Sequence, residues 1–151
     1  MIKIEFDGLD ELIHGVEMVA SKAMEETSSA LSQKTLDLAL ESYYAEEDPY
    51  GNMWDDWKVY PYPSISRSHE KLMIDTGALF DSIDVVDVNR HGFLLGSFGA
   101  TGFDGRGHAH FHQYGTSKMV ARQFLPEDGL PPLWFPIYVD VFEDTLRRII
   151  F

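Results

Sequence analysis

The sequence has no cysteine among its 151 residues. This absence excludes disulfide bonds, thiolate nucleophiles and cysteine-ligated zinc, and it suits a protein made in a reducing cytoplasm. The sequence also has no run of 18 apolar residues, so we expect no transmembrane helix and no membrane partner. Its first residues lack the basic segment and apolar stretch of a secretory signal peptide, so we expect no such peptide.

Positive charge is scarce as well. Lys and Arg total 12 against 25 for Asp and Glu, which gives a formal net charge of −13. A surface of this sign repels phosphate backbones, so direct nucleic-acid binding is not expected. An acidic surface is compatible with docking onto other proteins.

The motifs that carry common catalytic chemistry are also missing. The glycine-rich stretch 96–107 lacks the lysine and the spacing of a phosphate-binding loop. No serine lies in the G-x-S-x-G pattern of a nucleophile elbow, and no H-E-x-x-H zinc motif occurs. We therefore expect a protein that is not an enzyme and that has no catalytic residues, no cofactor and no resident metal.

What the sequence does contain is enough for a folded core. Hydrophobic residues make up 44% and aromatic residues 13%, which predicts one domain over residues 1–151. The expected fold class is α+β, with a long N-terminal helix and a C-terminal helix packed on a small, mostly antiparallel sheet. Glycine and proline predict exposed loops at about residues 46–70 and 96–107.

The two helices are predicted from apolar spacing. Apolar residues three and four apart predict a helix from residue 8 to about Tyr44, which Thr27-Ser28-Ser29 would bend or break. We interpret its apolar stripe as a core-packing face, with packing against a neighbouring subunit as the alternative. Similar spacing predicts the second helix over residues 133–151.

Shorter elements lie between the two helices. Alternation of apolar and polar residues predicts a strand over residues 1–6, a hairpin over 85–96 and a third sheet strand over 108–113. A short capped helix is predicted over residues 72–83. Trp54 follows an Asp-Pro-x-Gly turn, and we expect it to fasten the loop to the core with its indole N–H paired.

Three histidines give the only chemical alternative. His108, His110 and His112 alternate along the predicted third strand, which would place their imidazoles on one face at about 7 Å spacing. Neighbouring imidazoles can ligate zinc or nickel, and Asp104 is the nearest carboxylate in the sequence. The alternative function is therefore a metal-dependent enzyme that uses these three histidines. The competing interpretation is a hydrated or inter-subunit face.

Four segments follow one another between residues 45 and 126, with variable loops between them. They are DPYGNMW at 48–54, LMIDTGALFDSI at 72–83, HQYGT at 112–116 and VARQFLP at 120–126. In this order they resemble the tailed-phage virion-morphogenesis, or tail-completion, proteins of the Mu-like kind. The resemblance extends more loosely to the related neck and head–tail connector proteins.

The resemblance implies a structural protein of a phage or prophage, acting in virion assembly at tail completion or at the head–tail junction. It implies a homo-oligomer, with a ring as its form, located in the virion and, during assembly, in the host cytoplasm. The implied partners are other virion proteins of the neck, connector or tail tube. A generic protein-interaction module is the further alternative. The resemblance implies structural or interaction roles for Asp48, Gly51, Trp54, Asp75, Thr76, Gly77, His112, Gln113, Gly115, Arg122, Phe124 and Leu125.

Two features depart from the family pattern. Gln123 stands where the family commonly has proline. The glycine-rich stretch before residue 108 and the pair His108 and His110 also lie outside the pattern. The family resemblance therefore assigns no role to those two histidines.

The residue types suggest physical roles for the shared segments. Asp75 or Thr76 is expected to cap the helix that follows. Glycine at position 115 is expected to end a strand in a turn with positive φ. We expect Arg122 to be held by an acidic neighbour, and Phe124, with the leucine that follows it, to anchor a loop in the core.

Overall fold

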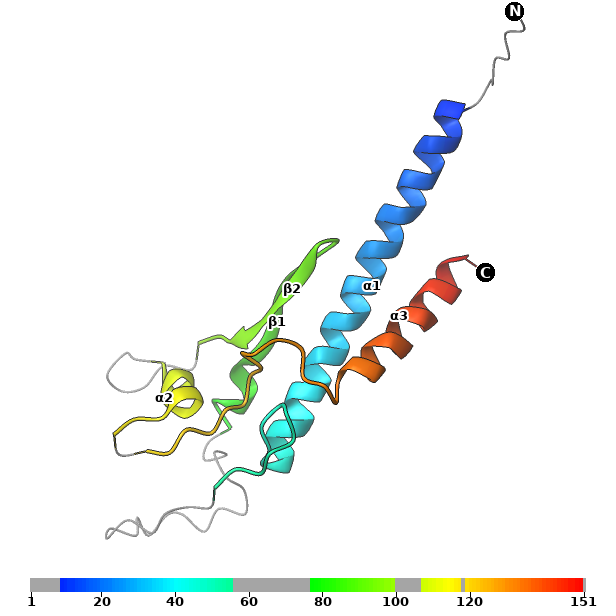
Figure 1. The fold of residues 1–151 in the computed structure, drawn as a ribbon. Coiled ribbons are helices and arrows are strands. Elements are labelled where there is room, and N and C mark those ends of the chain that lie inside the picture. Colours follow the sequence, from blue (N-terminus) through cyan, green and yellow to red (C-terminus); the bar gives the residue numbers. More distant parts are fainter. Residues whose placement is uncertain (1–8, 56–76, 100–106, 118, 151) are drawn as a thin grey trace, which may run out of the picture.

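The computed structural model describes residues 9–55, 77–99, 107–117 and 119–150. Its elements, in chain order, are α1 (Leu9–Ala45), a 3-10 turn (Phe80–Ser82), β1 (Ile83–Asn89), β2 (Gly92–Ser97), α2 (His108–Tyr114) and α3 (Phe135–Ile150). Within these ranges the fold is α+β, as predicted: a long first helix, a last helix and an antiparallel hairpin (Figure 1). The predicted strand 1–6 lies outside the described residues.

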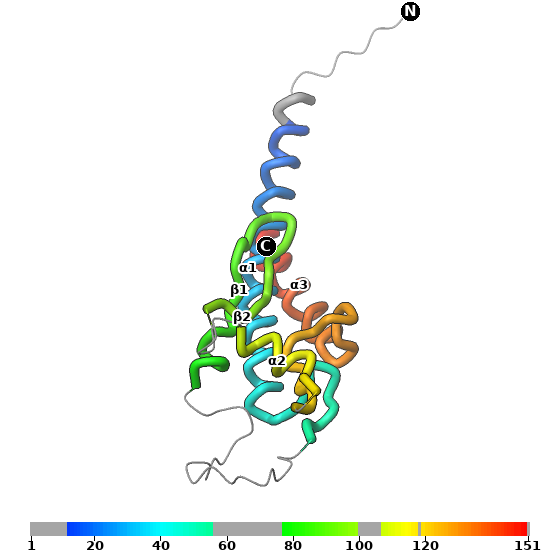
Figure 2. The backbone as a smooth tube through the Cα atoms, turned by 90° about the vertical axis from the view of Figure 1, so that its left-hand side faces the viewer, coloured from blue at the N-terminus to red at the C-terminus, as the bar shows by residue number. Residues whose placement is uncertain are grey.

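Helix α1 is the axis of the fold. The β1–β2 hairpin packs on one side of it and α3 packs on the other, running antiparallel to α1 (Figures 1 and 2). A two-stranded hairpin is marginally stable by itself, so its stability depends on the apolar surface that it buries against α1. The N-terminal part of α1 extends beyond both neighbours.

Helix α1 runs without a break through Thr27-Ser28-Ser29, so the predicted bend or break is wrong. Thr27 and Ser28 are buried, and packing at this level of α1 outweighs their modest helix propensity. The helix ends in a left-handed residue, Glu46, with φ of 63°. Its N–H donates to the Tyr43 carbonyl at 3.1 Å, and the next N–H donates to the Ser42 carbonyl at 3.0 Å. This pair of bonds is the Schellman arrangement, which more often uses glycine.

The hairpin was predicted correctly, with one irregularity. Ile83 pairs with Ser97 and Val86 pairs with Leu94, and the register then shifts before Asn89 pairs with Gly92. Asp87 lies in this shift with φ of 54°. A β-bulge of this kind accommodates an extra residue and increases the local twist.

The predicted third strand is wrong, because residues His108–Tyr114 form helix α2. The histidines occur at every second residue, as one face of a strand would require, but the buried residues do not follow this alternation. His112 and Gln113 are adjacent and both turn inward, which a strand does not permit and one side of a helix does. Gly115 ends the helix with φ of 71°, and its N–H donates to the Phe111 carbonyl at 2.9 Å.

The predicted short helix over 72–83 is seen only in its last part. In the described residues it is the 3-10 turn Phe80–Ser82, with Leu79 and Ile83 buried on either side. No side chain caps this turn at Leu79. The proposed cap residues Asp75 and Thr76 lie outside the described residues.

Helix α3 matches the predicted C-terminal helix and packs on α1 through hydroxyl-bearing side chains. The Tyr138 hydroxyl and Thr35 Oγ1 share a hydrogen bond across the two helices. Burial raises the pKa of Tyr138, and the bond to Thr35 offsets part of that rise. Thr145, further along α3, is 1% exposed.

The hydrophobic core lies at the C-terminal end of α1 and is centred on Tyr43. The Tyr43 ring contacts Trp54, Phe80 and Phe124 edge to face, at centroid distances of 5.2, 5.4 and 5.7 Å. Edge-to-face pairs of this kind add to the stabilisation from burial alone. Burial raises the pKa of the Tyr43 hydroxyl far above its usual value. The buried core residues are Leu38, Ala39, Tyr43, Trp54, Leu79, Ile83, Phe124 and Trp134.

Tyr43→Ala should lower the free energy of unfolding by about 3–5 kcal/mol, because it removes a fully buried ring from the centre of the core. Tyr44→Ala is the matched control, since Tyr44 is the next residue and is 58% exposed. We expect the control to cost less than about 1 kcal/mol in urea denaturation. Equal costs for the two substitutions would contradict this placement of the core.

Candidate functional site

Nine of the twelve residues singled out from the sequence lie in three segments that are far apart along the chain. The segments are the loop 46–55 after α1, helix α2 with Gly115, and the extended segment 121–127. In Figure 1 these segments lie together below the hairpin, around the C-terminal end of α1. We call the three segments together the motif core.

The loop 46–55 is shaped by the Asp48 carboxylate. It accepts hydrogen bonds from the backbone N–H groups of Tyr50 and Asn52, both at 2.9 Å, and from the Asn52 side chain at 2.8 Å. This is an Asx turn, in which a short acidic side chain replaces backbone partners. Gly51 completes the turn with φ of 86°, and a Cβ there would lie 3.0 Å from Leu133 Cδ1. The predicted turn chemistry is therefore confirmed.

Two buried side chains join this loop to the segment 121–127. The Trp54 indole N–H donates to the Gln123 carbonyl at 2.9 Å, as the expected pairing of a buried tryptophan requires. Arg122 is 4% exposed and donates from Nε and Nη2 to the Asp55 carbonyl at 3.2 and 2.9 Å. Asp55 thus contributes a backbone oxygen that holds the Arg122 guanidinium.

The side chain of Gln113 holds α2 to the same segment through both ends of its carboxamide. Its oxygen accepts from the N–H groups of Phe124 and Leu125 at 3.0 and 3.1 Å. Its nitrogen donates to the Leu125 carbonyl at 2.8 Å and to Glu127 Oε1 at 3.0 Å. A buried amide with all of its main bonds satisfied rigidifies its surroundings. Phe124, held this way, is 1% exposed in the core.

Backbone geometry adds further restraints around α2. The His112 carbonyl accepts from the Arg122 N–H at 2.7 Å. Gly115 lies at φ 71° and ψ −176°, a conformation essentially restricted to glycine. A Cβ at this position would lie 2.8 Å from both Ala121 N and Met119 O. The chain therefore turns back on itself here only because residue 115 has no side chain.

Gly77 is the last of the predicted site residues that can be placed. It has φ of 84°, and its carbonyl accepts from the Asp81 N–H at 2.8 Å, which supports the 3-10 turn. The structure therefore gives backbone or packing roles to ten of the twelve predicted residues.

Tyr50 is a member of the motif core that the sequence did not single out. Its hydroxyl accepts from the N–H groups of Glu127 and Asp128 at 3.2 and 2.8 Å. The clue was its position inside the Asp-Pro-x-Gly turn, although nothing in the sequence identified its partner. The hydroxyl of Tyr114 bonds the Glu127 carboxylate, which raises the pKa of Tyr114.

The three histidines do not form the row that suggested a metal. On a helix, His108 and His112 are four residues apart on one face, and His110 lies on another face. Among the described residues, no group of three His, Cys, Asp or Glu side chains could hold a metal ion. The geometric basis of the metal-enzyme alternative is therefore absent from the described part of the chain.

His112 is nevertheless the most unusual ionisable group in the motif core. Its Nδ1 is buried and has no hydrogen-bond partner. Burial, followed by the positive charges of His108 and Arg122, lowers the pKa of His112 below its ordinary 6.5. The folded protein therefore favours the neutral imidazole.

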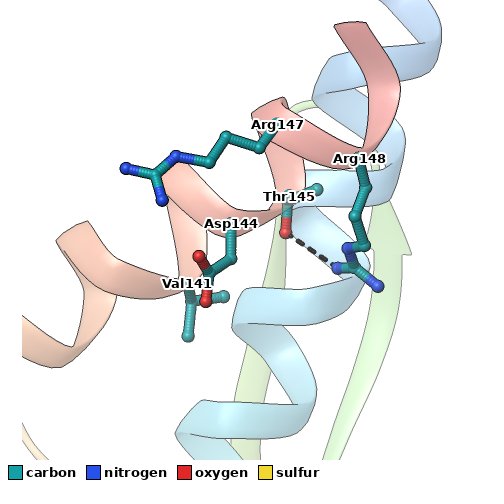
Figure 3. A pocket seen from close by; sticks show the side chains of 5 residues that line it. All are labelled: Val141, Asp144, Thr145, Arg147 and Arg148. Atoms are coloured by element: carbon teal, nitrogen blue, oxygen red, sulfur yellow. Dashed lines mark hydrogen bonds between the residues drawn. The ribbon is translucent and has the colours of Figure 1, made fainter. Parts of the chain in front are cut away.

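An open hollow lies on α3, away from the motif core. Its volume is about 440 Å³, and it is lined by Val141, Asp144, Thr145, Arg147 and Arg148 (Figure 3). Arg148 Nη2 donates to Thr145 Oγ1 at 3.2 Å, and Arg147 bonds Glu143 at 3.5 Å. None of the predicted site residues reaches this hollow.

The largest departure from the favoured sequence interpretation is an exposed apolar surface. Every residue from Leu12 to Ala20 on α1 is exposed, so this part of the stripe is not a core-packing face. In Figures 1 and 2 it projects clear of the hairpin and α3. Helix α3 also exposes Phe135 at 60% and Phe142 at 46%.

No helix in the described ranges is long and apolar enough to cross a membrane.

No protein-family model, curated protein or solved structure matches this chain.

Gln113→Ala should lower the free energy of unfolding by about 2–4 kcal/mol, because it leaves several buried backbone groups without partners. Gln123→Ala is the matched control, since its half-buried carboxamide makes one long bond, at 3.3 Å to the Leu125 carbonyl. We expect the control to cost about 0.5 kcal/mol in urea denaturation. A small cost for the first substitution would show that the segment 121–127 is held by other contacts.

Acidification should destabilise the protein through His112. Because its pKa is lower folded than unfolded, the unfolded chain binds this proton more readily. The stabilising contribution is complete above the unfolded pKa, near 6.5, and is lost as the pH falls through the folded pKa. Unfolding measured from about pH 8 to about pH 5 should show a smaller loss of stability in His112→Gln than in wild type. His110→Gln, at an exposed position, should follow the wild-type curve.

Proposed function

We propose that this chain is a structural protein of a tailed phage or prophage, acting in virion assembly at tail completion or at the head–tail junction. The observation that carries the proposal is that three of the four family-like segments, 48–54, 112–116 and 120–126, meet in one hydrogen-bonded unit. Asp48, Gln113 and Arg122 come from different segments, and each is used to hold backbone. The shared residues therefore fix the fold. Motifs made of such residues support membership of a family that has the same fold.

The buried polar side chains of the motif core favour a role in assembly over a role in catalysis. The carboxamide of Gln113 and the guanidinium of Arg122 are buried and bonded to backbone atoms, which leaves them unsuited to binding a substrate. Catalytic groups need to reach a reacting atom in a cleft. The proposed protein therefore performs no reaction of its own and has no cofactor.

The exposed surfaces favour protein partners. The net charge is −13, while helices α1 and α3 expose large apolar side chains such as Val16 and Phe142. Contiguous exposed apolar surface commonly marks a protein–protein interface. Copies of the chain and other virion proteins of the neck, connector or tail tube are the proposed partners, with an oligomeric ring as the assembled form. The proposed location is the virion, after assembly in the host cytoplasm.

Interruption of the gene in the phage or lysogen that encodes this chain tests the proposal. Electron microscopy of the induced lysate should show capsids and tails that fail to join, or tails that lack their end, and infectious titre should fall by several orders of magnitude. A wild-type copy supplied in trans should restore joined particles. Normal virions at normal titre in the interrupted strain would refute the proposed function.

A further inference from the structure

Helix α1 carries an apolar seam that the described chain leaves uncovered from Leu12 to Val19. Leu12, Val16 and Val19 are 64%, 61% and 56% exposed, and the half-buried Ala23 continues the row. Their spacing of four, three and four residues is that of a helix–helix packing seam. Most helical stability in proteins comes from packing of the apolar face, so a projecting bare helix of this kind lacks its main source of stabilisation. We call these four residues the α1 seam.

Helix α3 carries a second seam with the same spacing. Phe135, Val139 and Phe142 are 60%, 38% and 46% exposed, and two half-buried residues, Leu146 and Ile149, continue the row. Beside this seam lies the face of α3 that packs on α1 of the same chain, which carries Tyr138 and the buried Thr145. We call these five residues the α3 seam.

We infer that the α1 seam of one copy packs on the α3 seam of a second copy, with the two helices parallel. The seams match in spacing, and they complement each other in size. The α3 seam presents phenylalanines, and the α1 seam presents smaller leucine, valine and alanine side chains. Large side chains against small ones interdigitate better than two rows of phenylalanine do. The inference rests on the proposed function, which requires the chain to self-associate, and it identifies a contact that joins two chains into a pair within the proposed ring.

Charge fixes the orientation. Lys22 precedes Glu26 on α1, with their charged groups at 3.6 Å, whereas Glu143 precedes Arg147 on α3, at 3.5 Å. When the helices run parallel with Val16 level with Val139, the two pairs lie on the same flank. Lys22 then lies at a height between Glu143 and Arg147, and Glu26 lies about half a turn beyond Arg147. An antiparallel arrangement puts the two pairs on opposite flanks. Exposed pairs contribute little energy, so they select orientation more than they add affinity.

The other flank of the α1 seam is apolar and supports the same orientation. Ile13 is 48% exposed and Met24 is 59% exposed, and Ala20 lies between them along this flank. In the parallel arrangement this flank turns toward the face of α3 that carries Thr145, and therefore toward α1 of the second copy. In the antiparallel arrangement it would turn toward Glu143 and solvent.

A parallel contact cannot form within one chain. Helix α3 runs antiparallel to α1 of its own chain (Figures 1 and 2). For α1 to run parallel to α3 of a second copy, the two α1 helices must run antiparallel to each other. A two-fold axis produces that relation, and it makes the contact reciprocal. The assembly is therefore built from pairs of chains.

The buried area is sufficient for a stable pair. Nine large apolar side chains on the seams and their flanks are between 38% and 64% exposed. At about 100 Å² each, they present on the order of 1,000 Å² per contact, and a reciprocal pair contains two contacts. Stable interfaces bury about 1,200–2,000 Å² in total. The nine residues are Leu12, Ile13, Val16, Val19, Met24, Phe135, Val139, Phe142 and Ile150.

Cross-linking tests the contact and its orientation, because the chain has no cysteine of its own. Leu12→Cys mixed with Phe135→Cys should form disulfide-linked dimers at least tenfold faster than Leu12→Cys mixed with Ile150→Cys. The two α3 positions are about 22 Å apart along the helix, so one α1 residue cannot reach both. Faster linking with Ile150→Cys, linking of Leu12→Cys mainly to itself, or no linking in either mixture would overturn the inference.

A pair of lysine substitutions tests the energetics with a matched control. Val16 and Met18 are both 61% exposed, but only Val16 lies on the seam. Val16→Lys should raise the dissociation constant of the pair, measured by analytical ultracentrifugation, at least about tenfold. Met18→Lys should change it less than about twofold. Equal effects would place the contact elsewhere.

These outcomes separate the inference from the proposed function. A virion defect on gene interruption together with a different cross-linking pattern would refute the parallel seam contact and leave the assembly role intact. The expected cross-links together with normal virions would refute the assembly role and leave the contact intact.

Discussion

The Gln113 carboxamide is the interaction on which the rest of the motif core depends. It holds the N–H groups of Phe124 and Leu125 on one side and the Leu125 carbonyl on the other. These hydrogen bonds place the Phe124 ring against the Tyr43 ring, at the C-terminal end of α1. A buried carboxamide that makes only some of its hydrogen bonds costs free energy. The three segments of the motif core are therefore expected to come together in one step. Local turns, buried rings and backbone bonds therefore form one cooperative unit.

The described part of the molecule has one region with a packed, hydrogen-bonded interior and another with exposed apolar side chains. In the motif core, the side chains of Asp48, Gln113 and Arg122 bond to backbone groups, and the rings of Trp54 and Phe124 are buried. Along the first half of α1 and one face of α3, apolar side chains such as Val16 and Phe142 meet solvent. This division suits the proposed assembly role, in which the core keeps its shape while the helix faces contact other chains. The net charge of −13 keeps such a chain dispersed until a matching surface is met.

Much of the fold was readable from local patterns. The long helix, the hairpin, the last helix and the Trp54 anchor all follow from spacing, turn chemistry and the need to pair a buried indole. The errors arose where tertiary contacts override local pattern. The histidines of residues 108–114 alternate as on a strand. Gln113 and the adjacent His112 nevertheless both face inward, which one side of a helix permits and a strand does not. The α1 stripe has the same period whether it meets its own core or another chain, so periodicity alone could not reveal that Leu12–Ala20 is exposed.

Hydrogen–deuterium exchange at two protein concentrations tests this division most directly. In dilute protein, the amides of Phe124 and Leu125 should exchange only on global unfolding, while those of residues 12–20 should exchange quickly. At high concentration, residues 12–20 should become protected, and the motif core should not change. Slow exchange along all of α1 in dilute protein, or fast exchange at Phe124, would contradict the separation of a rigid motif core from an uncovered helix that awaits a partner.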